Sequence, residues 1–158
     1  MKGSYILIAR VKKDSKIDIG KLGKLDFKKG YYCYVGSANG KTVSLENRLK
    51  RHIKLSIEKK GKLRWHIDYF LTNHNVLLNG VIAFEKKPRK SECEPRKGEC
   101  EPRKSECEPR ESECGLSHIL EKSADYTVKK FGSSDCKCNS HLYRFKSLKK
   151  ILDVVESI

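Results

Sequence analysis

Residues 31–40, YYCYVGSANG, contain the clearest strand signal in this chain. Aromatic and β-branched side chains favour extended backbone, so residues 31–35 predict a strand. The Gly-Ser-Ala-Asn-Gly run after them is expected to end that strand. Residues 43–60 then predict an amphipathic helix, because apolar side chains recur four residues apart and form a stripe toward the core: Leu45, Leu49, Ile53 and Ile57.

The predicted helix carries basic side chains beside this stripe. Arg48 and His52 are four residues apart, so helical geometry places both along one border of the stripe. Arg51 is expected to point further toward solvent. Thr42 or Ser44 is the expected N-cap, because its hydroxyl accepts from an unpaired backbone N–H group of the first turn.

Elements of both types flank this strand and helix. Residues 4–11 predict a strand, residues 17–27 a twisted or bulged strand with two glycines, and residues 75–84 a buried strand. Residues 63–71 fit a helix and a strand equally well. The C-terminal part predicts short helices and one more strand after a Gly/Ser-rich turn: 113–122, 131–145 and 146–158. The interleaving predicts an α+β fold, with a small mixed or antiparallel sheet flanked by helices.

A heptapeptide repeat interrupts this pattern. Four prolines and four cysteines recur every seven residues in PRKSECE PRKGECE PRKSECE PRESEC, which begins at Pro88. Proline in every period excludes a coiled coil. The segment mixes both charges and offers few apolar side chains for a core, so we expect a disordered insertion at 86–112 within a single domain spanning 1–158.

The net charge of +15 belongs to the folded part of the chain. Residues 86–114 carry nine basic and eight acidic side chains, which leaves 26 basic and 12 acidic side chains on the other 129 residues. Such an excess favours a polyanionic partner, with nucleic acid as the first candidate. No apolar run approaches the roughly 20 residues of a membrane span. No signal peptide is evident either, so we expect a cytoplasmic protein without membrane contact.

Two short motifs give this basic domain a family resemblance. Residues 3–5, GSY, lie on the first predicted strand, and residues 34–36, YVG, lie on a later strand before a helix that carries Arg48. This layout resembles the GIY-YIG nuclease superfamily. The strings GYYCYVGSANG, RLKRH, WHIDYFL and FGSSDCKCNSHLY resemble an archaeal and bacterial branch of it that is known mainly as a domain of unknown function.

The resemblance implies metal-dependent hydrolysis of a phosphodiester in DNA. The implied catalytic residues are Tyr5, Tyr34, Arg48, His52 and Glu113, with Glu113 holding Mg²⁺ or Mn²⁺. The chemistry fits these roles, since a guanidinium matches phosphate oxygens and a hydroxyl or imidazole can relay a proton. Either tyrosine could be the base, and both could instead be core aromatics. The chain departs from compact superfamily members by an extra stretch at residues 12–29.

The repeat supplies a Glu-Cys pair four times, so the metal-binding glutamate could belong to any copy. We choose Glu113 because it alone leads into a predicted helix. We assign further contacts with the nucleic-acid backbone to basic side chains in and after the first helix: Lys41, Lys50, Arg51, Lys54 and Arg64.

Two further groups of side chains could form a secondary site. His66 and Asp68 form a second metal or base site in one interpretation and a structural hydrogen-bonded pair in the other, which we favour. Cys136, Cys138 and His141 could be a zinc half-site completed by Cys33 or His66, a disulfide, or reduced thiols near the active site.

These observations leave two functional hypotheses open, in addition to a weaker zinc- or redox-sensing role for the Cys-x-Cys segment. The favoured hypothesis is a metal-dependent DNA endonuclease in repair or processing. The alternative is a module that binds DNA or RNA and keeps the fold without catalysis. The sequence does not fix the oligomeric state.

Overall fold

The computed structural model describes residues 1–86, 112–134 and 136–158. Almost all of the predicted insertion at 86–112 lies outside the described residues. The strands are β1 (Gly3–Val11), β2 (Ser15–Asp18), β3 (Lys24–Phe27), β4 (Gly30–Ala38), β5 (Val76–Glu85), β6 (Tyr126–Thr127) and β7 (Leu142–Phe145). The helices are α1 (Leu45–Glu58), α2 (His66–Leu71), α3 (Glu113–Ser123) and α4 (Leu148–Glu156), and a 3₁₀ turn spans Gly20–Leu22.

The α+β prediction is confirmed. In the described part of the chain, five strands form a sheet in the order β5-β1-β4-β7-β6, and every pairing is antiparallel. The single strand predicted over 17–27 is wrong, because β2 and β3 pair with each other as a separate two-stranded ribbon. The chain reverses between them at Gly20 and Gly23, which both have positive φ, so these glycines form the turn rather than a bulge.

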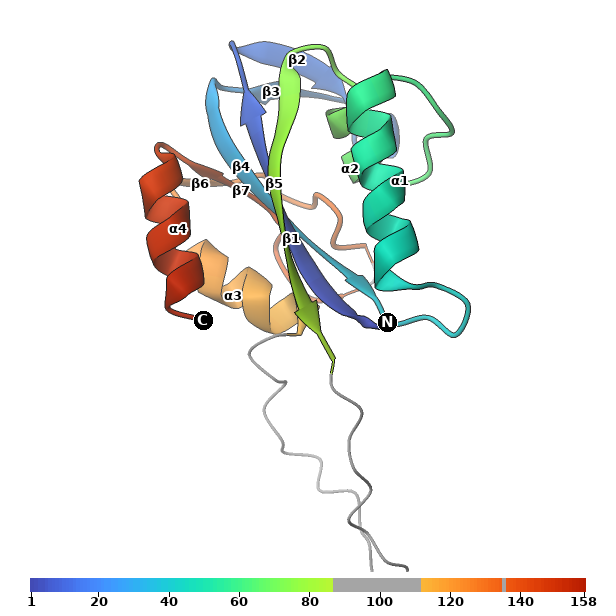
Figure 1. The fold of residues 1–158 in the computed structure, drawn as a ribbon. Helices are drawn as coiled ribbons and strands as arrows, with labels where there is room; N and C mark the ends of the chain where they lie inside the picture. Colours follow the sequence, from blue (N-terminus) through green and yellow to red (C-terminus); the bar gives the residue numbers. More distant parts are fainter. Residues whose placement is uncertain (87–111, 135) are drawn as a thin grey trace, which may run out of the picture.

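The sheet is covered on both faces (Figure 1), with α1 and α2 on one side and α3 and α4 on the other. Strand alternation supplies both cores. Tyr5, Leu7 and Ala9 of β1 join the core under α1 and α2, whereas Ile6 and Ile8 join the core under α3 and α4. This double burial explains why the β1 sequence is apolar at nearly every position. None of the helices in the described ranges is long and apolar enough to cross a membrane.

The strand β4 continues through the glycine that was expected to end it. Gly36 lies opposite Tyr5 in the antiparallel register, and a Cβ atom at this position would collide with the Tyr5 ring. The glycine therefore leaves room for a neighbouring side chain within the strand, and β4 extends to Ala38. This motif glycine positions the ring of the motif tyrosine.

Helix α1 is shorter than predicted and buries a different face. Ser44 is the N-cap, and its hydroxyl accepts from the Asn47 N–H group. Ile53 and Ile57 are exposed, whereas His52 and Leu55 are buried. A step of four residues turns the helix about 40° beyond one full turn, so a strict i, i+4 stripe rotates away from the sheet over three steps. The residues of α1 that face the core are instead spaced alternately four and three apart, as in Leu45, Leu49, His52 and Leu55.

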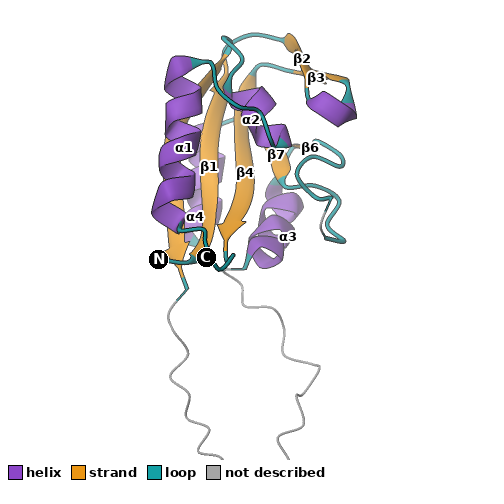
Figure 2. Cartoon of the chain, turned by 90° about the vertical axis from the view of Figure 1, so that its right-hand side faces the viewer, coloured by secondary structure: helices purple, strands orange, loops and turns teal. Residues whose placement is uncertain are grey.

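The remaining predictions need small changes. Residues 63–71 resolve into α2, and the predicted strand at 75–84 is β5. The predicted C-terminal helices are α3 and α4, which start at Glu113 and Leu148. The short strand expected within 131–145 is β7, and β6 was not predicted because it has only two residues. The view turned by 90° (Figure 2) shows the long loop between β6 and β7 beside the first turn of α3.

Candidate active site

One pocket brings together all five residues that the resemblance implied. Its volume is about 460 Å³, and its lining includes Tyr5, Tyr34, Arg48, His52 and Glu113. These residues come from β1, β4, α1 and the first turn of α3. Lys21 and Arg64 also line the pocket, so among the described residues it combines three basic side chains with one carboxylate, that of Glu113. Such a balance suits an anionic ligand.

Tyr5 and His52 form a buried polar pair in this pocket. The Tyr5 hydroxyl shares a hydrogen bond with His52 Nε2 at 2.8 Å, and both residues are almost fully buried. Burial lowers the pKa of His52 to about 4, so the imidazole is neutral at neutral pH. Burial also raises the pKa of Tyr5, although the Arg48 guanidinium acts in the opposite direction. The pair therefore holds a neutral hydroxyl against a neutral base.

Arg48 is fixed by its neighbours. Its Nη1 donates to the Ser37 carbonyl at 2.5 Å, and its guanidinium lies 4.7 Å from the centre of the Trp65 ring. Stacking on an aromatic face and a backbone hydrogen bond restrict a side chain that is otherwise flexible. The guanidinium therefore reaches the pocket with few accessible rotamers.

Glu113 is the first residue of α3, and Ser112 caps that helix by accepting from the Gly115 N–H group. The Ser37 hydroxyl donates to Glu113 Oε2 at 2.7 Å, and His141 Nδ1 lies 3.0 Å from Oε1. Burial alone would raise the pKa of Glu113, but the contacts with His141 and Ser37 outweigh it and lower the pKa. The carboxylate is ionised, and its position at the helix N-terminus is electrostatically favourable.

Tyr34 lines the same pocket and also belongs to the core under α1 and α2. Its ring contacts Phe131 and Tyr5, and burial raises its pKa well above the ordinary value. The Tyr34 ring also leaves little room for a side chain at position 132, because a Cβ atom at Gly132 would lie 3.0 Å from it. Gly132 also has φ +67°, which is strained for other residues.

The predicted backbone-binding residues do not form one group. Arg64 is exposed and lines the pocket, and Lys41, Lys50 and Lys54 are exposed elsewhere. The expectation that Arg51 points to solvent is wrong, because its guanidinium donates to both carboxylate oxygens of Asp68 at 2.8 and 2.7 Å. Asp68 is fully buried, so its charge requires this partner.

His66 and Asp68 have different partners. The Asp68 carboxylate accepts from the Arg64 and Trp65 backbone N–H groups in addition to Arg51. Burial acts to raise the pKa of Asp68, but these hydrogen bonds dominate and lower it. His66 Nδ1 accepts from the Gly132 N–H group at 2.9 Å and lines the pocket. Asp68 therefore has the structural role that we favoured, whereas the expected pairing with His66 is wrong.

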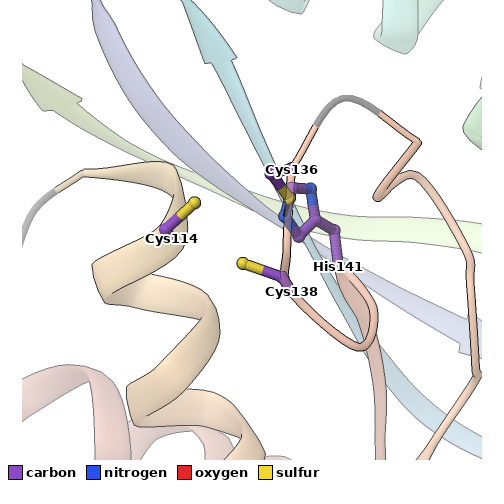
Figure 3. A group of neighbouring side chains, drawn as sticks. All are labelled: Cys114, Cys136, Cys138 and His141. Carbon is purple, nitrogen blue, oxygen red and sulfur yellow. Dashed lines mark hydrogen bonds between the residues drawn. The ribbon is translucent and has the colours of Figure 1, made fainter.

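A second cluster lies beside the pocket (Figure 3). Sγ of Cys114, Cys136 and Cys138 and a ring nitrogen of His141 all lie within 4.8 Å of one another, an arrangement that could hold a metal ion. Cys136 and Cys138 are thiols rather than disulfide-bonded. The proposed fourth ligands were wrong: Cys33 is buried among the core residues under α3 and α4, and His66 is bonded to Gly132.

Sequence reasoning missed several residues at the site. Ser37, Trp65 and Gly132 lie within the strings that carry the family resemblance, but no role was assigned to them, because their roles come from contacts between distant segments. Lys21 shows that part of the extra stretch at residues 12–29 lines the pocket. Cys114 could have been found, because the argument that selected Glu113 among four copies applies equally to the cysteine that follows it.

Comparison with known proteins places the chain in a family. The model of the family described as Domain of unknown function DUF123 matches residues 4–101 and 99–158, so the chain belongs to that family. No curated protein and no solved structure matches the chain significantly. The family description names no activity, and any function must be argued from the pocket.

Proposed function

We propose that this protein is a metal-dependent endonuclease that hydrolyses phosphodiester bonds in DNA, in repair or in processing of damaged or branched strands. The observation that carries the proposal is the convergence of Tyr5, Tyr34, Arg48, His52 and Glu113 in one pocket. These are the residues that the resemblance to GIY-YIG nucleases implied. The basic surplus of the chain supports a nucleic-acid substrate.

The basic side chains of the pocket bind the scissile phosphate. Arg48 is held by Trp65 and by the Ser37 carbonyl, and its remaining N–H groups can donate to phosphate oxygens. Arg64 is exposed at the pocket and binds a neighbouring phosphate. Fixed donors of this kind stabilise the charge that develops on the phosphoryl oxygens.

Tyr5 and His52 supply the proton path. The Tyr5 hydroxyl accepts a proton from the attacking water while it passes its own proton to His52 Nε2, which lies 2.8 Å away. The low pKa of His52 keeps this nitrogen in its base form at neutral pH. A concerted transfer avoids a free tyrosinate, which burial of Tyr5 disfavours.

Glu113 is the residue that would hold the divalent cation. Its carboxylate lines the pocket, and Mg²⁺ is commonly held by one or two carboxylates together with substrate phosphates, so the donor set fits. When bound, the cation would supply polarisation of the phosphate and a more acidic water. The Ser37 hydroxyl holds the carboxylate by a hydrogen bond, and His141 Nδ1 lies 3.0 Å from its other oxygen.

The proposal is tested with a panel of duplex, nicked, flapped and branched DNA in Mg²⁺ or Mn²⁺, with and without chelator. We expect cleavage of at least one substrate, its loss with chelator, and its loss in Arg48→Ala and Glu113→Ala proteins. Glu156→Ala changes an exposed carboxylate on α4 and serves as the control. Tight DNA binding that is unaffected by chelator, with no product from any substrate, would instead establish the non-catalytic binding module.

A further inference from the structure

We infer that Cys114, Cys136, Cys138 and His141 form a zinc site whose histidine ligand holds the pocket carboxylate Glu113 in place. The site joins two segments that are far apart in the sequence, the first turn of α3 and the loop that precedes β7. The inference does not rest on the proposed nuclease activity, because metal binding can be measured without DNA.

The ligand set is typical of structural zinc. Three thiolates and one imidazole form a common tetrahedral arrangement, with Zn–S near 2.3 Å and Zn–N near 2.0 Å. In such a tetrahedron the ligand atoms lie roughly 3.5–3.8 Å apart. Here all four lie within 4.8 Å of one another, and Cys136 Sγ is 3.3 Å from His141 Nε2. Small side-chain rotations are enough to close the site, and thiolates favour zinc over Mg²⁺.

Backbone hydrogen bonds hold several of the described residues around the cluster. The His141 N–H group donates to the Phe131 carbonyl at 2.8 Å, and the His141 carbonyl accepts from the Val35 N–H group at 2.9 Å. The Lys130 N–H group donates to the Asn139 carbonyl at 2.8 Å. On the other side, the Ser112 cap fixes the start of α3. Figure 3 shows the Cys138 sulfur directed toward the helix that bears Cys114.

The two nitrogens of His141 connect the cluster to the pocket. Nε2 faces the sulfur of Cys136, and Nδ1 lies 3.0 Å from Glu113 Oε1. In the described residues this buried Nδ1 meets the geometry of a hydrogen bond with no group, and Glu113 Oε1 is the carboxylate oxygen close to it. Histidines that bind metal through one nitrogen commonly donate from the other nitrogen to a carboxylate, which orients both groups. Glu113 and Cys114 are adjacent, so a single helical turn supplies one residue to the pocket and one to the cluster.

The arrangement also resembles a thiol–imidazole–carboxylate catalytic triad, with Cys136 in the position of the nucleophile. Two additional sulfur atoms, from Cys114 and Cys138, lie within 4.8 Å of the same imidazole. A nucleophile needs one accessible thiolate and space for a substrate, whereas a tetrahedral metal needs four converging ligands. The convergence therefore favours the metal.

The first test measures metal in the full chain, purified without chelator under a reductant that binds no metal. We expect about one zinc per chain, retained in Cys107→Ser, which changes the corresponding cysteine of the preceding repeat copy, and lost in Cys136→Ser/Cys138→Ser. Titration of the metal-free wild-type chain with Co²⁺ is expected to give tetrahedral visible bands and sulfur-to-cobalt charge transfer. A metal-free chain that shows no thiolate band with Co²⁺, or that has one selectively alkylated thiol, would overturn the zinc site.

The second test addresses the link to Glu113. Changing a carboxylate that supports a metal-bound histidine typically weakens metal affinity 10–100-fold. We expect a loss of about this size in Glu113→Gln, measured by competition with a zinc chelator. Glu121→Gln is the matched control, because Glu121 lies on the same helix and accepts from Asn139 of the same loop at 2.8 Å without contacting a ligand. Equal losses of zinc affinity in the two variants would refute the link between Glu113 and the zinc site. A zinc-loaded chain that cuts no DNA would contradict only the proposed function.

Discussion

Replacing Arg51 with alanine tests whether this side chain stabilises the folded state, in contrast to the predicted role in binding nucleic acid. The substitution leaves the fully buried Asp68 carboxylate without the guanidinium that donates two hydrogen bonds to it. Removing one partner of a buried ion pair costs about 3–5 kcal/mol. We expect the lower end, about 3 kcal/mol, because 28% of the Arg51 side chain is exposed and water can enter the space it leaves. Loss of the contact with Trp65 adds to the cost.

The free energy of unfolding is measured by urea titration at neutral pH. Lys54→Ala, on the exposed face of the same helix, is the control and should change it by less than about 0.5 kcal/mol. Because Asp68→Asn removes the buried charge, the double variant Arg51→Ala/Asp68→Asn should be less destabilised than the sum of the single variants, by about 1 kcal/mol or more. An Arg51→Ala protein as stable as the Lys54→Ala protein would refute this reasoning.

Three other perturbations follow from the pocket. The pKa of His52 is about 4 in the folded chain and 6.5 in the unfolded chain, so the unfolded chain takes up a proton first as pH falls. The free energy of unfolding should therefore be unaffected above pH 6.5 and fall by about 3 kcal/mol as pH drops to 4. A His52→Gln protein that keeps the same pH dependence would contradict this. Gly36→Ala should destabilise by about 1–3 kcal/mol through collision with Tyr5, whereas Gly80→Ala, where a Cβ atom meets nothing within 4 Å, should not; equal unfolding midpoints would count against the packing role. Arg48→Lys should slow DNA cleavage roughly 100-fold, because an ammonium cannot replace the forked donor; single-turnover rates at wild-type level would exclude that role.

The main strands and helices could be predicted because their sequences are locally consistent. Alternate residues of β1 and β4 belong to the two cores on opposite faces of the sheet, so both strands are apolar along most of their length. Ser44 was recognisable as one of two possible N-caps of α1. The errors have local causes. The continuation of β4 past Gly36 depends on the Tyr5 ring from another strand, and the buried face of α1 depends on its angle to the sheet.

The five motif residues of the pocket could be anticipated only from the family resemblance, since nothing local brings β1, β4, α1 and α3 together. The partners that fix them could not be anticipated. Ser37 bonds to Glu113 across 76 positions, and Gly132 bonds to His66 across 66 positions. Arg51 and Arg48 have similar sequence surroundings, yet the fold gives one a buried carboxylate and the other a place in the pocket.

The most direct test of the central claim compares DNA binding and DNA cleavage by wild-type and Glu113→Gln protein in the same samples, with metal content measured in each. The pocket predicts that Glu113→Gln binds DNA about as tightly as the wild type but cuts it at least about 100-fold more slowly, because the carboxylate serves chemistry rather than affinity. Cleavage by Glu113→Gln at the wild-type rate would contradict the catalytic role of this carboxylate.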